Sequence, residues 1–189
     1  MSAAAISLRR LGPEDAALYR DLRLEALADS PDAFASTLET EQRRPLDWFA
    51  GRLADAFIMG AFAGERLSGV AGFYVQPGPK HAHKGMLWGM YVRPEYRAAG
   101  VGRRLVEAII GHASERVELL QLFVVSDNLA ARRLYEKLGF VEYGVERHAT
   151  KYRGQYHDDV LMALPLVVEC ADDAPHCAAS EISAGEISS

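Results

Sequence analysis

The stretch RAAGVGRRL, residues 97–105, lies between two apolar segments and decides the fold prediction. Before it, residues 85–92 read GMLWGMYV, which is typical of a buried strand, and an amphipathic helical repeat begins at residue 101. Gly100 and Gly102 let the backbone turn sharply and approach a ligand, because glycine has no Cβ atom. Free N–H groups at a helix N-terminus and nearby arginines both attract anions. We therefore predict a turn that holds a phosphate or pyrophosphate group.

Two familiar phosphate-binding motifs fit this stretch poorly. A dinucleotide fingerprint would place a third glycine at position 105, where the chain has Leu105, and its acidic residue at the end of a strand, whereas Glu118 precedes one. A P-loop requires a lysine followed by Ser or Thr, which this stretch does not contain. A dinucleotide-dependent enzyme is therefore disfavoured. For the glycine pair alone, a plain tight turn with a solvated basic face stays the alternative.

Hydrophobic periodicity around the turn predicts one mixed α/β domain with the element order β-α-α-β-β-β-α-β-α-β-β. On the first helix, Leu18, Leu22 and Ala26 recur at the spacing of a buried face. The almost continuously apolar segment 117–125 is typical of a strand covered on both faces. The expected helices are 12–31, 45–54, 101–114 and 128–138, and the expected strands are 5–8, two within 56–75 around the turn 64–66, 85–92, 117–125, 140–149 and 158–166, with a loop at 150–156.

Composition and charge narrow the function. Of 189 residues, 49% are apolar and 25% charged, which is ordinary for a globular protein. Residues 169–189 carry five acidic and no basic side chains, which leaves 21 acidic and 21 basic side chains in residues 1–168. We expect a domain over 1–168 and a flexible acidic tail over 169–189. We also expect a cytoplasmic protein with no nucleic-acid or membrane partner. Cys170 and Cys177 lie in the tail, and we expect neither a disulfide framework nor a metal site.

Two motifs together resemble one known family. The segment YVRPEYRAAGVGRRLVEAI, residues 91–109, resembles the acetyl-CoA-binding segment of the GNAT superfamily of N-acetyltransferases. The segment NLAARRLYEKLGF, residues 128–140, is similar to the second motif of that family. The predicted order of elements over residues 6–166 also matches. The resemblance implies a GNAT-like mixed sheet with splayed central strands and acetyl-CoA as the acetyl donor. The motif residues are Arg97, Gly100 and Gly102 in the first segment, and Asn128, Ala131, Tyr135, Gly139 and Phe140 in the second.

The resemblance also implies where acetyl-CoA binds. The pyrophosphate would meet the backbone N–H groups of residues 98–103, and the pantetheine arm would follow the strand before the turn. The N–H of Met90 or Val92 would donate to the developing oxyanion, and Tyr135 would protonate the leaving thiolate. Asn128 either contacts the cofactor or caps its helix. The implied cofactor-binding residues are Met90, Tyr91, Val92, Arg97, Ala98, Ala99, Gly100, Val101, Gly102, Arg103 and Asn128.

The general base is missing from its usual place. Many family members carry a glutamate on the first splayed strand, but here residues 86–92 read MLWGMYV, without a carboxylate. The amine must lose a proton before it attacks, because lysine-like amines have a pKa of about 10.4. A water chain is one alternative source of the base. The side-chain candidates elsewhere are Glu39, Glu41, His81 and His83.

The leading interpretation is acetyl transfer from acetyl-CoA to a primary amine of a small molecule or a protein. The alternative is a non-catalytic module that binds or senses acyl-CoA, an interpretation that the missing strand carboxylate favours and Tyr135 disfavours. The acceptor stays unidentified, and a homodimer stays open. In the family, the acceptor site lies between the first two helices and the last strand pair. Its aromatic candidates, each also suited to plain packing, are Phe34, Trp48, Trp88, Tyr152 and Tyr156.

Overall fold

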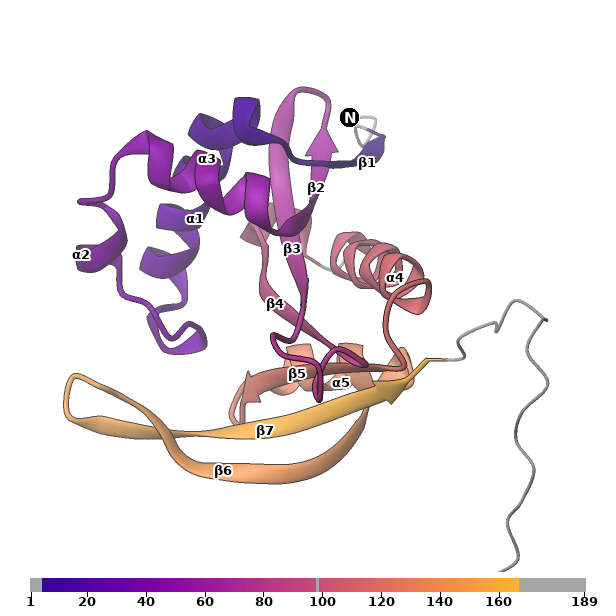
Figure 1. The fold of residues 1–189 in the computed structure, drawn as a ribbon. Helices are drawn as coiled ribbons and strands as arrows, with labels where there is room; N and C mark the ends of the chain where they lie inside the picture. The colour runs from indigo at the N-terminus through magenta and orange to yellow at the C-terminus, as the bar shows by residue number, and fades with distance from the viewer. Residues whose placement is uncertain (1–4, 98, 167–189) are drawn as a thin grey trace, which may run out of the picture.

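A seven-stranded mixed sheet forms the centre of the protein, and helices pack on both of its faces (Figure 1). The computed structural model describes residues 5–97 and 99–166. Its strands are β1 (Ile6–Arg10), β2 (Phe57–Ala63), β3 (Arg66–Val75), β4 (Lys84–Val92), β5 (Leu119–Val125), β6 (Val141–Tyr152) and β7 (Gln155–Pro165). Its helices are α1 (Ala16–Asp29), α2 (Leu38–Glu41), α3 (Leu46–Asp55), α4 (Val101–Ser114) and α5 (Leu129–Lys137), with short 3₁₀ turns η1 (Pro13–Asp15), η2 (Pro31–Ala33) and η3 (Pro94–Tyr96).

The strand order β1-β2-β3-β4-β5-β7-β6 places the one parallel pairing of the sheet, β4 with β5, in its middle. The other neighbouring strands are antiparallel. A parallel pair needs a crossover connection, and α4 supplies it between β4 and β5. The turn at residues 97–103 is therefore the start of the crossover, at the carboxyl end of β4.

Two hydrophobic clusters lie on opposite faces of this sheet. One joins the buried face of α4, including Leu105 and Ile109, to β5 and β7. The other joins α1 and α3 to β2 and β3, with Leu22 and Phe49 fully buried. Tyr91 of β4 belongs to the α1 side and Val92 to the α4 side. Because β4 contributes to both clusters, its central residues are held firmly between the two layers.

The predicted fold class is confirmed, with corrections in detail. Helix α4 has the predicted bounds, and the predicted first helix is divided into η1 and α1. Leu18 is 42% exposed, so the predicted buried face is wrong there, and Tyr19 packs in its place. The one-turn helix α2 was not predicted, since four residues are too few to show a periodic pattern.

The predicted loop 150–156 is also wrong, because β6 and β7 continue through most of it. Arg153 and Gly154 alone turn the chain, with φ of 47° and 84°. Positive φ at both central residues matches the right-handed twist of a hairpin, which lets the two strands extend to the turn.

No helix within residues 5–97 and 99–166 is long and apolar enough to cross a membrane. The predicted acidic tail, and the domain boundary at residue 168, lie outside the described residues.

Candidate active site

Strands β4 and β5 diverge after a short stretch of pairing, and a cavity opens where they part. Their register covers only Lys84–Met86 against Leu119–Gln121, although β4 continues to Val92 and β5 to Val125. Gly89 has a φ of 62°, and the register of β4 with β3 shifts near it, which marks a bulge in β4. The cavity has a volume of about 670 Å³, within the usual range for small-molecule sites.

The cavity brings together residues from both predicted motifs. The predicted cofactor-binding residues that line it are Met90, Tyr91, Val92, Arg97, Gly100, Gly102, Arg103 and Asn128, and the predicted acid Tyr135 lines it as well. Ala99 does not line it, and Val101 is buried in the core below the turn. Ala98 lies outside the described residues. Segments that are about 35 residues apart in the sequence therefore meet around one space, as the resemblance implied.

The backbone of β4 turns donors toward this cavity. The N–H of Arg93 donates to the carbonyl of Ser68, on the β3 side of the strand. Because successive residues of a strand point their N–H groups to opposite edges, the N–H groups of Val92 and Met90 face the side where β5 has moved away. The backbone N–H of Tyr91 points to β3 instead, where Val70 is its register partner. Of the three predicted strand residues, Met90 and Val92 thus have the orientation of oxyanion donors, and Tyr91 does not.

The α4 N-terminus opens onto the same space. Gly100 is its N-cap with a φ of 76°, a conformation that side-chain-bearing residues avoid. A Cβ atom on Gly102 would lie 2.9 Å from Cε of Met90, so a side chain there would occupy the cavity. The first N–H groups of the helix have no partner within it, and they carry the positive end of the helix dipole. This geometry fits an anion held by backbone donors.

The arginine side chains are less available than the sequence suggested. Arg97 donates to the carbonyl of Val92 at 2.9 Å and to Asp29 of α1 at 2.6 Å, and its guanidinium holds the pKa of Asp29 below the ordinary value. Arg104 donates to the carbonyl of Ile6, away from the cavity. Arg103 pairs with Glu107 on the helix surface at 2.7 Å. The backbone, with Arg103 at the rim, therefore supplies most of the donors of the predicted anion site.

Tyr135 reaches the cavity from the opposite wall. It lies on α5 in the hydrophobic core, only 6% exposed, and packs edge-on against Phe140. Its hydroxyl donates to Sδ of Met90 on β4 at 3.3 Å. Burial raises the pKa of Tyr135 well above its ordinary value, so the hydroxyl stays protonated at neutral pH. The spacing of residues along α5 predicts a ligand face of Asn128, Ala131 and Tyr135 and a core-facing stripe of Ala130, Leu134 and Leu138. This separation is wrong, because Tyr135 also packs in the core and Ala130 is exposed.

The second motif also stabilises its own helix. Asn128 is the N-cap of α5, and its side-chain oxygen accepts from the N–H of Ala131 at 3.1 Å. Arg132 donates to the carbonyl of Ser126 and to Glu142, so its side chain fastens α5 to the adjoining loop and β6. Asn128 lines the cavity as well as capping the helix, so the two predicted roles are compatible.

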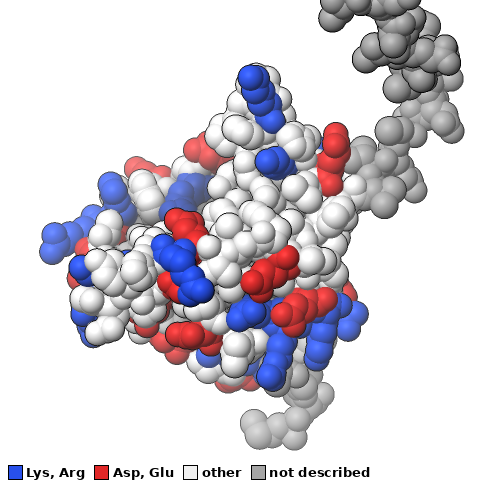
Figure 2. All heavy atoms as spheres, turned by 90° about the horizontal axis from the view of Figure 1, so that it is seen from below, with Lys and Arg blue, Asp and Glu red and all other residues white. Residues whose placement is uncertain are grey.

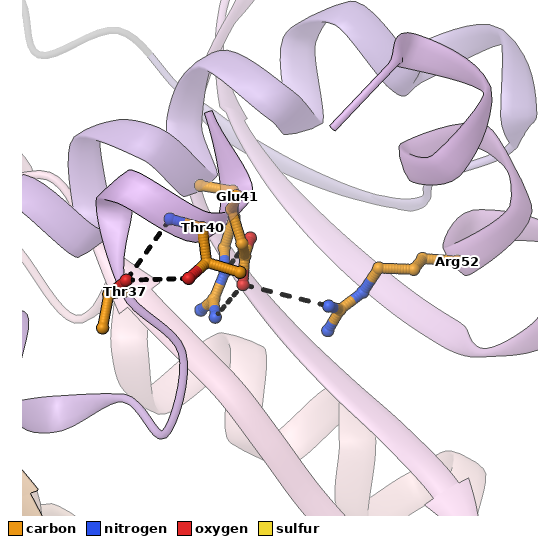
Figure 3. Close-up of polar contacts among 5 residues, drawn as sticks. Thr37, Thr40, Glu41 and Arg52 are labelled. Atoms are coloured by element: carbon orange, nitrogen blue, oxygen red, sulfur yellow. Dashed lines mark hydrogen bonds and ion pairs between the residues drawn. The ribbon is translucent and has the colours of Figure 1, made fainter. Parts of the chain in front are cut away.

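The predicted base candidates lie elsewhere. None of Glu39, Glu41, His81 and His83, all of them within the described residues, lines the cavity. Glu39 is exposed on α2, and His81 and His83 are exposed in the loop between β3 and β4. Glu41 is buried and accepts from Arg23 at 2.8 and 3.0 Å, with Arg52 at 4.0 Å (Figure 3). Burial alone would raise the pKa of Glu41, but the hydrogen bonds and charge of Arg23 outweigh it and lower that pKa.

The Glu41–Arg23 pair supports the wall of the cavity on the α1 side. The guanidinium of Arg23 lies 4.5 Å from the ring centre of Phe34, which lines the cavity. Arg52 lies over Trp88, another lining residue, at 4.7 Å. Of the other predicted aromatics, Trp48 packs against Phe49, and Tyr152 and Tyr156 lie beside the turn of the β6–β7 hairpin. Of the five aromatic residues predicted for the acceptor site, Phe34 and Trp88 are therefore the two that line the cavity.

Some lining residues had no clear sequence signal. Phe123 on β5 is 53% exposed, although its apolar segment predicted a strand covered on both faces. The segment is apolar because one face packs in the core and part of the other borders the cavity.

Ser30 and Ala33, at the end of α1 and in η2, also line the cavity and are small enough to leave an opening. On the face seen in Figure 2, basic and acidic side chains are interspersed rather than gathered by sign.

Comparison with known proteins agrees with this geometry. The acetyltransferase (GNAT) family profile matches residues 19–140. A mycothiol acetyltransferase from Thermobispora bispora is 32% identical over 149 residues, which span 75% of this chain and 48% of that protein. The [ribosomal protein bS18]-alanine N-acetyltransferase of Escherichia coli strain K12 is 38% identical over 81 residues, which span 42% of this chain and 55% of that protein. The chain thus spans about half the length of these curated relatives.

Solved structures share the whole fold. A GNAT acetyltransferase from Streptococcus pneumoniae superposes with a TM-score of 0.77 at 23% identity, over 86% of this chain and 100% of that one. The protein yncA of Salmonella typhimurium, solved with its cofactor acetyl-CoA, gives a TM-score of 0.74 at 23% identity, over 90% of this chain and 99% of that one. With both motifs on one cavity and the family profile spanning them, the chain belongs to the acetyltransferase (GNAT) family.

Proposed function

We propose that this protein transfers the acetyl group of acetyl-CoA to a primary amine of a small molecule or a protein. The observation that carries the proposal is the cavity between the splayed strands β4 and β5, with the glycine-rich start of α4 at one end and Tyr135 at its wall. The family and its named N-acetyltransferase relatives support the same activity. The donor and the acceptor can then approach one another from opposite sides of the sheet.

The described residues fit acetyl-CoA. The N–H groups of Val101, Gly102 and Arg103 at the start of α4 suit a pyrophosphate. Gly100 and Gly102 have no side chain that would keep the pyrophosphate away from these groups. The pantetheine arm has the unpaired edge of β4 to follow, where Met90 and Val92 direct their N–H groups. Acetyl-CoA supplies an activated acetyl group as a thioester, and the protein supplies donors and an apolar enclosure around it.

Three steps follow for the residues around the acetyl group. The amine must be brought in without its extra proton. The N–H of Met90 or Val92 donates to the thioester oxygen as negative charge develops there. As the carbon–sulfur bond breaks, the hydroxyl of Tyr135 gives its proton to the departing sulfur, and the amine proton lost on amide formation restores the hydroxyl. Burial raises the pKa of Tyr135, so its hydroxyl still carries a proton when the thiolate departs.

The names of the relatives do not identify the acceptor of this protein. One relative is named a mycothiol acetyltransferase, and the other is named for an alanine of ribosomal protein bS18. Phe34, which follows η2, and Trp88 on β4 both border the cavity, so the proposed acceptor side has an aromatic component. A cytoplasmic location, a homodimer, and the lack of a nucleic-acid or membrane partner stay predictions from the sequence.

Acetyl-CoA turnover tests the proposal directly. Release of free thiol would be followed with a panel that includes spermidine, glucosamine and an alanine-initiated peptide, and the product would be verified by mass spectrometry. We expect at least one acetylated amine. A protein that binds acetyl-CoA but acetylates none of a broad amine panel is instead the acyl-CoA-binding module. Stabilisation against heat by CoA but not by NAD separates both from a dinucleotide-dependent enzyme.

A further inference from the structure

One carboxylate near the cavity has no explanation in the packing of the fold. Oδ1 of Asp159, on β7, is buried and meets no hydrogen-bond donor in the described part of the chain. A buried charged oxygen without a partner is costly, and such atoms in native proteins call for a reason. Asp159 is therefore a candidate for contact with a bound molecule rather than with another residue of the protein.

The strand geometry shows which way Asp159 faces. Val160 and Met162, its neighbours along β7, are buried in the core on the α4 side. Since strand residues alternate between faces, His157 and Asp159 face the other side of the sheet. The position of His157 agrees, because its Nε2 lies 3.6 Å from Asp32 in η2. Asp159 thus lies on the face that carries η2, which is opposite to the α4 face.

That position is next to the cavity. The register partner of Asp159 on β5 is Val125, which lines the cavity. In η2, the residue after Asp32 is Ala33, and both Ala33 and the following Phe34 line it too. Asp159 does not itself line the cavity, but it is next to the side bounded by β5 and η2, through Val125 on the neighbouring strand. An acceptor that enters from this side passes close to its carboxylate.

The surroundings of Asp159 suit a proton acceptor. Burial raises its pKa, and the charge of Glu146, its register partner on β6, and of Asp158 raises it further. His157 lowers it, and Nε2 of His157 lies 3.6 Å from Asp32 of η2. On β5 the opposing residue is the uncharged Val125. A carboxylate with a raised pKa removes protons better than an ordinary aspartate while it is still ionised at neutral pH.

We infer that Asp159 binds the ammonium group of the acceptor and removes its proton. The inference rests on the proposed acetyltransferase function and assigns its missing base. One N–H bond of the ammonium breaks, its electron pair stays on nitrogen, and the proton goes to the carboxylate of Asp159, either directly or through one water. The neutral nitrogen then attacks the thioester carbon, and Asp159 returns the proton to solvent. The acceptor is therefore a cationic amine, which the carboxylates of Asp159 and Glu146 attract.

Asp159→Asn tests the assignment, with Asp158→Asn as the matched control. Asp158 is the adjacent carboxylate, but it accepts from Arg147 and from the N–H of His148 instead. With an amine that the wild type acetylates, we expect Asp159→Asn to lower kcat/KM by about 10²- to 10⁴-fold and Asp158→Asn to leave it within a few-fold. The affinity for acetyl-CoA, measured by calorimetry, should be unchanged in both variants.

Glu146→Gln gives an independent readout that leaves Asp159 in place. Removal of the Glu146 charge lowers the pKa of Asp159, so the rising limb of the pH profile of kcat/KM should move to lower pH. If Asp159→Asn fails to fold, the pH profile of Glu146→Gln tests the assignment instead. A rising limb at the same pH as in the wild type then overturns the assignment of Asp159 as the base. Wild-type turnover in Asp159→Asn overturns it while the acetyltransferase function stands. A wild type that binds acetyl-CoA but acetylates no amine overturns both.

Discussion

The hydroxyl of Tyr135 on α5 donates to Sδ of Met90 on β4, 3.3 Å away, and this contact joins the two motifs at the cavity. Met90 is also one of the two residues whose N–H groups face the splayed side of β4. A protonated side-chain donor and a backbone donor therefore both border the cavity, and acyl transfer can use such donors for the departing sulfur and the developing oxyanion.

Replacement of Tyr135 by phenylalanine removes only that hydroxyl. The ring should keep its packing against Phe140, so the melting temperature and the affinity for acetyl-CoA should change little. We expect kcat to fall by about 10²- to 10⁴-fold, the usual contribution of a positioned acid. Where departure of the thiolate limits the rate, the loss should become smaller as pH rises. Single-turnover measurements that show wild-type chemistry would assign Tyr135 to packing alone.

The buried pair of Glu41 and Arg23 should contribute to stability rather than to catalysis. Glu41→Gln leaves Arg23 buried without its counter-charge, and the free energy of unfolding should fall by about 3–5 kcal/mol. The pKa of Glu41 is lowered in the folded state, so its stabilisation is complete above the unfolded pKa of about 4.3 and is lost as pH falls through the folded value.

Urea unfolding at neutral pH and below pH 4 measures this effect. The exposed Glu39→Gln on the same helix serves as the control and should stay within about 0.5 kcal/mol of the wild type. The difference between the wild type and Glu41→Gln should narrow at low pH. Equal stability of the two at pH 7 would show that the pair is not a structural support.

Asp159 should have the opposite effect on stability. Its pKa is raised in the folded state, so its contribution is fully present below the unfolded pKa of about 3.9 and is lost as pH rises through the folded value. Asp159→Asn should therefore melt at a higher temperature than the wild type at pH 7, and the gap should close as pH falls. Such a cost is typical of residues kept for function. A lower melting temperature in Asp159→Asn at every pH would indicate a structural role.

The fold was predictable because the periodic signals were strong. Residues 101–114 repeat apolar positions along one stripe over the whole length of α4, and its bounds were predicted without error. The turn between the last two strands was predicted as too long a loop, because the positive φ of Arg153 cannot be inferred from the type of its side chain. Leu18 was misplaced because apolar spacing does not tell which of two faces of α1 packs.

The sequence predicted the part of the site in which the backbone itself would contact the ligand. Gly100 and Gly102 show directly where a side chain is absent, and the structure places both on the cavity. The orientation of the Met90 and Val92 donors, and the position of Asp159 beside the cavity, depend on strand pairing between distant segments. Periodicity within one segment carries no such information, so the sequence alone could not place Asp159 among the candidate bases.

Calorimetric titration of acetyl-CoA against Gly102→Val tests most directly whether the start of α4 holds the acetyl donor. The three atoms nearest to a Cβ atom at residue 102 belong to the side chains of Met90, Leu134 and Val92, and the nearest is the flexible end of Met90, so the fold should survive. Gly111→Val is the matched control on the same helix, because a Cβ atom there meets nothing within 4 Å. We expect the dissociation constant to rise at least tenfold, about 1.4 kcal/mol, for Gly102→Val and to stay at the wild-type value for Gly111→Val. A wild-type dissociation constant in folded Gly102→Val would contradict the assignment of this turn to acetyl-CoA.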